Sequence, residues 1–407
     1  MRILHVSDCY LPRLGGIEVQ VDELARAQLA AGHLVSIVTA TPSPGHDPNV
    51  PAVHRVAAPW LRRMPWELPV GGSPAPVLSL LKPDVVHIHT GAVSPFAWRA
   101  VRHAVRERLP AVVTVHSMWG PLSAALYRGL AARCGRRPSG VVVTAVSEAA
   151  AAPVRAVMAG RVPVEVVSNG IDTARWRPEA RAGAGAGGVH IVSVGRLAPR
   201  KEPVTLLRLL AAARRGVPAA IPLRATVVGD GPARSRMTRF IGRYGMGDWV
   251  RLAGRLDRDE IRDVLAGADI FLAPAARESF GLAALEARLA GVPVVAQAGS
   301  GVADFIAPGR EGLLGGTFGE LAGALVRLAT DDVLRAEIAA HNRVTEPVRC
   351  GWPAVLAAFD RCYERAAARP SNAVPPSNAV PPSNAVPPSA EAPPSVPSGR
   401  RRGARPA

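Results

Sequence analysis

Residues 277–286 read RESFGLAALE, and they are the most informative segment of the chain. Upstream of it, Asp269–Pro274 is a short apolar run that predicts a buried parallel strand ended by proline. Downstream, leucines recur at helical spacing at Leu282, Leu285 and Leu289. The sequence therefore predicts a strand, a loop and a helix in succession.

Two glutamates flank the start of this helix, Glu278 in the loop and Glu286 about one turn into the helix. A helix N-terminus offers free backbone N–H groups and the positive end of a dipole. Carboxylates accept hydrogen bonds from sugar hydroxyls, whereas backbone amides bind anionic oxygens. The segment therefore suits a polyhydroxyl group that lies next to a phosphate.

The segment resembles the E-x7-E motif of the retaining GT-B glycosyltransferases of family 4. The resemblance implies an α/β protein with two Rossmann-like, doubly wound domains, an inter-domain cleft and a C-terminal helix that crosses back to the first domain. It also implies that Glu278 holds sugar hydroxyls and that Glu286 binds the nucleotide ribose. The donor-binding backbone and side chains between them are Ser279, Phe280, Gly281 and Leu282.

Length and composition bound the remaining possibilities. The chain has 407 residues, of which 48% are hydrophobic, and a formal net charge of +17. This length predicts two domains of roughly 150–200 residues each. The basic residues are spread along the whole chain without aromatic–basic repeats, so nucleic-acid binding is not expected.

Cysteine usage and hydropathy indicate a cytoplasmic protein, with peripheral attachment to the inner face of the cell membrane as the alternative. The cysteines are scattered, which is typical of free thiols in a reducing compartment: Cys9, Cys134, Cys350 and Cys362. The chain opens directly on a predicted strand, so no signal peptide is expected. No apolar run reaches the ~18–20 residues that a membrane span requires.

Residues 1–172 alternate apolar runs with helical segments, which is typical of a doubly wound parallel sheet. A helix is predicted at 17–31. The predicted strands are 2–7, 34–40, 84–89, 111–115, 141–145 and 164–167.

A second alternating series covers residues 189–350, with predicted strands at 190–194, 224–228, 250–252, 269–273 and 293–296. Between the two series, residues 173–188 contain AGAGAGG and are interpreted as a linker. Residues 351–369 predict the terminal helix. The tail, 370–407, repeats SNAVPP three times and is expected to be disordered.

Two further segments lie where a parallel sheet binds ligands. Gly15 and Gly16 separate the first strand from its helix, where glycine lets backbone amides approach a phosphate. His116 ends a strand. By resemblance, Gly15-Gly16 lies by the donor diphosphate and acceptor, and His116 is the histidine of a T-x-H motif near the reacting sugar carbon. His89 and then His87 rank below it, since capping of loop backbone explains these two equally well.

Arg196 and Lys201 follow the first strand of the second series on a loop that leads into a helix. Two cations at this spacing can clamp a diphosphate, Arg196 as a fork for two oxygens and Lys201 as a mobile point charge. They match the family's G-R-x4-K motif, whereas Arg200 is expected to be solvated. With these cations, no metal or other cofactor is expected.

Two further segments have the form of known motifs, and their context argues against the cofactor and metal that those motifs would bind. Gly229-Asp230-Gly231 lacks the third glycine of a dinucleotide fingerprint, because position 234 is arginine, and it matches the G-x-G-P loop of GT-B donor domains. Asp257-Arg258-Asp259 has the D-x-D form of metal-dependent transferases but precedes a predicted helix, where Asp257 would serve as N-cap.

The resemblance implies a hexosyltransferase that uses a nucleotide-diphosphate sugar and transfers the sugar with retention of anomeric configuration, and the two cations predict that it needs no metal. Family members use GDP-mannose, UDP-glucose or UDP-N-acetylglucosamine, and the composition favours GDP-mannose. The acceptor is a hydroxyl of a glycolipid, a polysaccharide or a small molecule. The alternatives are a catalytically silent sugar-nucleotide-binding protein of the same fold and a UDP-sugar epimerase-like enzyme.

A possible membrane contact is predicted in the first domain, where two tryptophans and two arginines gather in one loop. Tryptophan prefers the membrane interface and arginine is attracted to anionic head groups. The four residues are Trp60, Arg62, Arg63 and Trp66. Simple packing of both tryptophans under a surface loop is the alternative.

Overall fold

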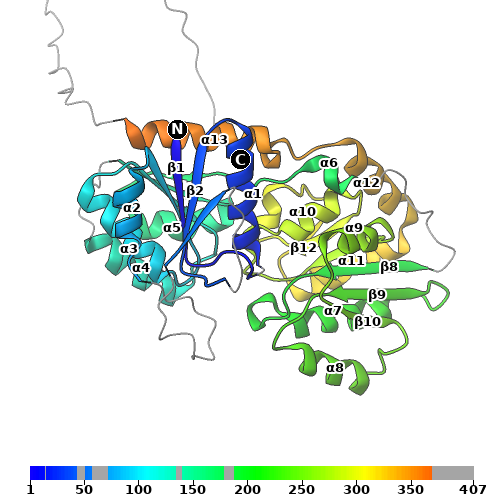
Figure 1. Ribbon diagram of the computed structural model, residues 1–407. Helices are drawn as coiled ribbons and strands as arrows, with labels where there is room; N and C mark the ends of the chain where they lie inside the picture. The colour runs from blue at the N-terminus through cyan, green and yellow to red at the C-terminus, as the bar shows by residue number, and fades with distance from the viewer. Residues whose placement is uncertain (14, 44–50, 57–71, 134–139, 178–187, 369–407) are drawn as a thin grey trace, which may run out of the picture. The chain divides into compact units, whose positions relative to one another are not determined.

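Two parallel β-sheets with flanking helices make up the described chain (Figure 1). The structure is a computed structural model, and it describes residues 1–13, 15–43, 51–56, 72–133, 140–177 and 188–368. Parallel strands joined through helices are the arrangement that the alternating sequence pattern predicts.

The first sheet has the strand order β3-β2-β1-β4-β5-β6-β7, and all of its pairs are parallel. The chain passes outward from β1 to β3 and then returns to β4 on the other side of β1. The strands are β1 (Arg2–Ser7), β2 (Leu34–Thr39), β3 (Ala52–Arg55), β4 (Val85–Thr90), β5 (Ala111–Val115), β6 (Val141–Ala145) and β7 (Val164–Val166).

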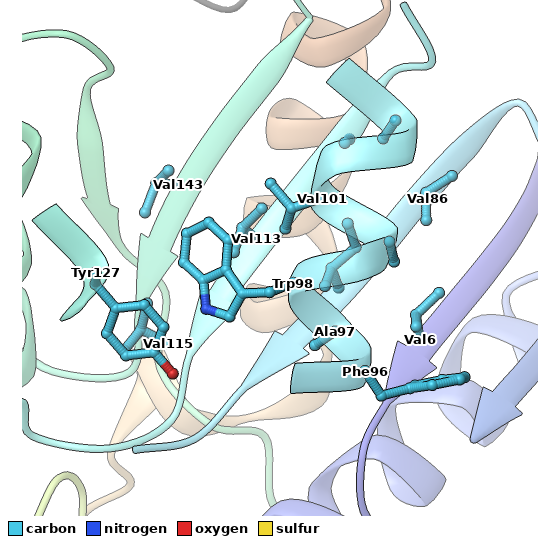
Figure 2. Packing of buried hydrophobic residues seen from close by; sticks show 14 of the residues in the cluster. Val6, Val86, Phe96, Ala97, Trp98, Val101, Val113, Val115, Tyr127 and Val143 are labelled. Atoms are coloured by element: carbon cyan, nitrogen blue, oxygen red, sulfur yellow. The ribbon is translucent and has the colours of Figure 1, made fainter. Parts of the chain in front are cut away.

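Helices cover both faces of this sheet, and every residue of its central strands β4 and β5 is buried. Figure 2 shows one face, where the indole of Trp98 packs near Val113 and Val143 and beside the ring of Tyr127. The Trp98 and Tyr127 rings stack at a centroid distance of 5.1 Å. The helices are α1 (Gly16–Ala30), α2 (Ala75–Leu81), α3 (Pro95–Glu107), α4 (Pro121–Arg133) and α5 (Glu148–Met158).

The second sheet has the order β10-β9-β8-β11-β12-β13 and is also parallel throughout. Here too the chain reverses direction across the sheet, between β8 and β11. The strands are β8 (Val189–Val194), β9 (Leu223–Val228), β10 (Val250–Gly254), β11 (Ile270–Ala273), β12 (Val294–Gln297) and β13 (Gly312–Gly315).

Helices and short 3-10 turns connect and cover these strands. The α-helices are α6 (Thr173–Trp176), α7 (Pro203–Gly216), α8 (Arg234–Arg243), α9 (Arg258–Ala266), α10 (Leu282–Leu289), α11 (Phe318–Thr330) and α12 (Asp332–Val344). The 3-10 turns are η2 (Pro199–Lys201), η3 (Gly301–Asp304) and η4 (Val348–Cys350).

The last described helix, α13 (Trp352–Ala367), packs on the first sheet although it follows the second in sequence (Figure 1). Its Phe359 and Tyr363 share one buried cluster with Ile3 of β1 and Val112 of β5. The predicted crossing of the terminal helix back to the first Rossmann-like unit is therefore confirmed.

The predicted strands agree with the structure to within two residues at each end. Two four-residue strands, β3 and β13, were not predicted. Both lie at sheet edges, where a short strand needs no long apolar run. Strand β13 also begins and ends with glycine, Gly312 and Gly315, which are unfavourable in strands.

The predicted domain boundaries stay predictions, because Met1–Pro370 forms one compact unit. Within the expected linker, Thr173–Trp176 forms helix α6, and the indole of Trp176 is buried in the core. Residues 178–187 of the linker and the tail predicted at 370–407 lie outside the described residues.

Candidate active site

The loop with Glu278 leaves β11 and enters α10, as predicted. Gly281 occupies the N-cap of α10 with φ = 95°, a conformation that favours glycine. A methyl group at this position would also lie 2.6 Å from Cγ2 of Val302. The Glu278 carbonyl accepts a hydrogen bond from Gly301 N at 2.8 Å, so the turn η3 fixes the backbone of this loop.

Lys201 and Glu278 form an ion pair between Nζ and Oε2. Lys201 ends η2, after β8, whereas Glu278 follows β11, the neighbouring strand. Both side chains are partly exposed, at 29% and 17%. The structure therefore brings together the predicted diphosphate cation and the predicted sugar carboxylate.

Arg196 lies on the exposed loop that follows β8. Backbone hydrogen bonds hold this loop against the Gly229–Gly231 turn: Leu197 N donates to the Asp230 carbonyl at 2.9 Å. Gly229 has φ = 127°, and a side chain there would collide with the Gly195 carbonyl. The G-x-G turn thus supports the loop that carries Arg196. Arg200 is exposed, as expected.

Glu286 points into the protein and is 9% exposed. Burial raises the pKa of its carboxyl to about 7, against the lowering effect of the Arg258 guanidinium. Arg258 itself forms an ion pair with Glu23 of α1. Glu286 therefore belongs to a charged cluster that joins α10, α9 and α1.

The first loop contributes a second helix N-terminus. Helix α1 begins at Gly16, and a Cβ added there would lie 4.0 Å from Cδ1 of Leu282, the first residue of α10. The two helix N-termini are thus near each other. The buried carboxylate of Glu18 turns back over Gly15 and pairs with Arg13 at 3.2 Å.

Elements of the first sheet also hold the Glu278 loop. Ser147, the N-cap of α5, donates its hydroxyl to the Ser279 carbonyl at 2.5 Å. The amide of Glu148 donates to Asp304 Oδ2 at 2.8 Å. The guanidinium of Arg277 lies against Gly120, four residues after His116. The loop with Glu278 is thereby in contact with residues that follow β5 and β6.

His116 follows β5, and its Nε2 lies 2.9 Å from Nδ1 of His89. The interpretation of His87 and His89 as caps of loop backbone is wrong, because their ring nitrogens bond side chains. His87 contacts Tyr363 Oη at 2.8 Å and Thr114 Oγ1 at 2.7 Å. His89 Nε2 contacts Nδ1 of His5 at 2.8 Å.

His5 and Gln28, which were not predicted as site residues, continue this series of hydrogen bonds. His5 Nε2 lies 2.7 Å from Gln28 Oε1. A signal was available: the apolar strands 2–7 and 84–89 carry histidines, and a buried imidazole needs hydrogen-bond partners. Only the pairing of β1 with β4, in which His5 aligns with His87, shows that the rings meet.

Nitrogen atoms of His5, His87 and His89 lie within 4.8 Å of one another, as they would around a metal ion. However, the His87 and His89 rings stack, with centroids 4.2 Å apart and planes inclined by 29°. Ring lone pairs in such planes do not converge on one point as ligands of a metal do. Each nitrogen of the three rings also has a hydrogen-bond partner already. The cluster is therefore a hydrogen-bond network.

Asp257 is the N-cap of α9, as predicted. Its carboxylate accepts hydrogen bonds from Asp259 N at 3.0 Å and Glu260 N at 2.9 Å, and Glu260 completes a capping box. The carboxylates of Asp257 and Glu260 thus both accept hydrogen bonds from backbone N–H groups at the start of α9.

Cys9, Cys350 and Cys362 carry free thiols, as predicted, while Cys134 lies outside the described residues. The loop with Trp60, Arg62, Arg63 and Trp66 lies outside them too, so membrane contact stays a prediction. No helix of the described chain is long and apolar enough to cross a bilayer.

Two family models match consecutive parts of the chain. "Glycosyltransferase Family 4" matches residues 14–175, and "Glycosyl transferases group 1" matches residues 179–355. The boundary between them falls between the two sheets.

Curated relatives match over nearly their whole length. A D-inositol 3-phosphate glycosyltransferase 2 of Catenulispora acidiphila is 29% identical over 404 residues, which are 89% of this chain and 93% of the relative. A glycogen synthase of Mycobacterium tuberculosis is 29% identical over 415 residues, covering 92% and 98%.

Solved structures share the fold. Anabaena HepE in complex with UDP and glucose has a TM-score of 0.70 at 19% identity and covers 89% of this chain and 99% of its own. The sucrose-phosphate synthase of Thermosynechococcus elongatus has a TM-score of 0.72 at 19% identity, with coverage of 89% and 98%. The fold and the site define a GT-B glycosyltransferase that uses nucleotide sugars. Across the two matched segments the chain is similar to the glycosyltransferases of family 4.

Proposed function

We propose that this glycosyltransferase moves a hexose from a nucleotide-diphosphate sugar to an acceptor hydroxyl with retention of anomeric configuration. The observation that carries the proposal is the ion pair of Lys201 with Glu278. A donor sugar has a hydroxylated ring next to a diphosphate. A carboxylate and a cation in contact match those two groups.

The leaving group is stabilised electrostatically in this proposal. Arg196 and Lys201 neutralise the charge that develops on the departing nucleoside diphosphate. The N-termini of α1 and α10, at Gly16 and Leu282, add backbone N–H groups for phosphate oxygens. The C1–oxygen bond to the diphosphate breaks, and the acceptor oxygen bonds C1 on the same face. A leaving phosphate oxygen takes the acceptor's proton.

The remaining predicted site residues orient the donor. Glu278 accepts hydrogen bonds from sugar hydroxyls, with help from the backbone of Phe280 and Gly281, and Glu286 binds the ribose. His116 hydrogen-bonds a sugar hydroxyl near the reacting carbon. These roles follow from the family's motif and are supported by the proximity of the two helix N-termini.

We propose that the reaction requires no metal ion. The support is that Arg196 and Lys201 supply positive charge and that Asp257 is engaged as a helix cap. Transfer should therefore survive EDTA.

The donor is proposed to be GDP-mannose, which the composition favours. A UDP sugar is the second candidate, because HepE has been solved with UDP-glucose as well as with UDP. A thermal-shift panel of sugar nucleotides decides between them, since a ligand present at 100 times its Kd stabilises the native state by about 2.7 kcal/mol.

Two acceptors should be tested first, an inositol phosphate and a polysaccharide, because the curated relatives are named for such substrates. Donor and acceptor are mixed, nucleoside diphosphate release is measured, and the product's anomeric configuration is read by NMR. An inverted product refutes the retaining mechanism. Donor binding without any turnover, with or without acceptor, supports the alternative of a silent binding protein.

We also propose peripheral membrane contact through the loop with Trp60, Arg62, Arg63 and Trp66, on the sequence alone. Anionic liposomes should bind the protein, and binding should weaken with salt and in the double variant Arg62→Glu with Arg63→Glu. Absence of binding at every salt concentration, together with full activity on a soluble acceptor, refutes this contact.

A further inference from the structure

Beneath His116 lies a continuous chain of hydrogen-bonded side chains. His116 Nε2 is 2.9 Å from His89 Nδ1, and His89 Nε2 is 2.8 Å from His5 Nδ1. His5 Nε2 is 2.7 Å from the Gln28 carbonyl oxygen, Oε1. All three distances lie within the donor–acceptor range of protein hydrogen bonds. This series of hydrogen bonds runs from His116 to the face of the first sheet that α1 and α13 cover.

The imidazoles in this chain are neutral. Burial lowers the pKa of His5 and of His116 to about 4, and it lowers the pKa of His89 well below its usual value. A neutral imidazole has one N–H donor and one nitrogen lone pair. Each ring can therefore donate to one neighbour and accept from the other, which gives the whole chain a direction.

The direction depends on the orientation of the Gln28 amide, whose carbonyl oxygen faces His5 in the structure. Its carbonyl oxygen can only accept, so the proton of His5 resides on Nε2. His5 Nδ1 then accepts from His89 Nε2, and His89 Nδ1 accepts from His116 Nε2. The last ring in the chain is thus protonated on Nε2, and its Nδ1 retains the lone pair.

A second branch of hydrogen bonds starts at the amide nitrogen of Gln28. This nitrogen donates to Tyr363 Oη at 2.7 Å, and this hydroxyl lies 2.8 Å from His87 Nδ1. Gln28 and Tyr363 are both buried. If the Gln28 amide were turned over, every hydrogen bond in both branches would reverse, and His116 would carry its proton on Nδ1. The two orientations therefore predict opposite tautomers of His116.

We propose that His89, His5 and Gln28 are positioning residues that hold His116 as its Nε2–H tautomer, so that Nδ1 accepts a hydrogen bond from a substrate hydroxyl. The part about the substrate rests on the proposed function. The part about the tautomer rests on the hydrogen-bond geometry and on the orientation of the Gln28 amide. A ring nitrogen's protonation state is set by the bond that its other nitrogen makes.

The test uses three variants of the full chain. His89→Leu removes the acceptor for His116. His89→Asn keeps one, because a carboxamide oxygen takes the place of Nδ1. His87→Leu is the matched control: His87 is equally buried in the same strand and stacks on His89, yet its hydrogen bonds go to Tyr363 and Thr114.

The first readout is the ring ¹⁵N chemical shifts of His116 in protein labelled at histidine. The unaltered protein, His89→Asn and His87→Leu should show a protonated Nε2 and an unprotonated Nδ1. His89→Leu should show averaging of the two tautomers. If His89→Leu does not fold, Gln28→Met removes the directing carbonyl from the far end and should give the same averaging. An Nδ1–H tautomer in the unaltered protein, or an identical tautomer in all variants, overturns the proposal.

The second readout is transfer or donor hydrolysis. His89→Leu should lower kcat roughly 10²-fold with little change in KM, and His89→Asn should restore it to within about 10-fold of the unaltered protein. Equal kcat losses in His89→Leu and His87→Leu overturn the positioning role. If no donor is turned over by the unaltered protein, the proposed function fails. The NMR result still decides whether the hydrogen bonds from Gln28 through His5 and His89 to His116, called the histidine relay below, fix the tautomer.

Discussion

Lys201 and Glu278 form an ion pair although 77 residues separate them in sequence. The pair exists because the strands that precede these residues, β8 and β11, are neighbours in the second sheet. Before a donor binds, each charge neutralises the other. A bound donor offers both groups new partners, a diphosphate for the ammonium and sugar hydroxyls for the carboxylate.

Lys201→Ala should therefore lower turnover roughly 10²-fold, the scale of losing one preorganised electrostatic contact. Arg196→Ala should do the same. The matched control is Arg200→Ala, which removes an exposed cation one residue away from Lys201. The measurement is kcat for nucleoside diphosphate release. Turnover like that of the unaltered protein in both Lys201→Ala and Arg196→Ala would refute the assignment of these cations to the diphosphate.

The position of Glu278 also depends on Gly301. A Cβ at residue 301 would collide with the Ser279 carbonyl, so Gly301→Ala must push the loop away from η3. We expect a loss of turnover of about 10²-fold, since small misplacements of a positioning group have this effect. Gly299→Ala is the control, because a Cβ at Gly299 meets no atom within 4 Å. Equal kcat values for the two variants would contradict the argument.

Asp257→Ala should affect stability more than catalysis. Loss of an N-cap destabilises a protein by about 1 kcal/mol, measurable as a lower urea midpoint. Asp259→Ala removes the second acid of the D-x-D segment, which is 66% exposed and pairs with Arg175, and should change the midpoint less. If EDTA abolishes transfer and manganese restores it, and both variants are inactive, this segment binds a metal and the proposal of metal independence is wrong.

The sheets could be predicted because their strands are short apolar runs flanked by turn residues, as in β11 before the Glu278 loop. The edge strands β3 and β13 were not predicted, because an edge strand does not need a long apolar run. Lys201 and Glu278 could be assigned from local motifs with characteristic spacing. Their contact follows from strand order, which a single sequence does not state.

The histidine relay could not be predicted for a related reason. His5, Gln28 and His89 each lie on a different element, and none belongs to a motif with fixed spacing. His89 was ranked below His116 as a site residue, although the two rings are hydrogen-bonded. What joins these residues is burial: each polar side chain inside the protein must find a partner, and the partners are other buried polar side chains.

The same burial predicts how stability depends on pH. In the folded protein the pKa of His5 and of His116 is about 4, and those of His87 and His89 are well below the usual value because the rings are desolvated. In the unfolded chain histidine titrates near ~6.5. As the pH falls from 7 to 5, the unfolded state therefore gains about three protons at these four residues that the folded state does not bind, which favours unfolding.

Two buried acids act in the opposite direction. Burial raises the pKa of Asp8 to about 6 and that of Glu286 to about 7. Over the same pH range the folded state gains protons at both carboxyls while the unfolded chain leaves them ionised. At pH 5 these four histidines and two acids leave the unfolded state with about two more bound protons than the folded state, and the lowered pKa of His190 acts in the same direction as those of the four histidines. Each proton contributes about 1.4 kcal/mol per pH unit, so the free energy of unfolding should fall by roughly 3 kcal/mol per unit there.

Urea unfolding at pH 7, 6 and 5 measures this slope. His89→Asn removes one of the four histidines, so its slope near pH 5 should be smaller by about 1.4 kcal/mol per pH unit. A urea midpoint that stays constant or rises between pH 7 and pH 5 would mean that the buried histidines accept protons in the folded protein. In that case the relay beneath His116 is not made of neutral rings.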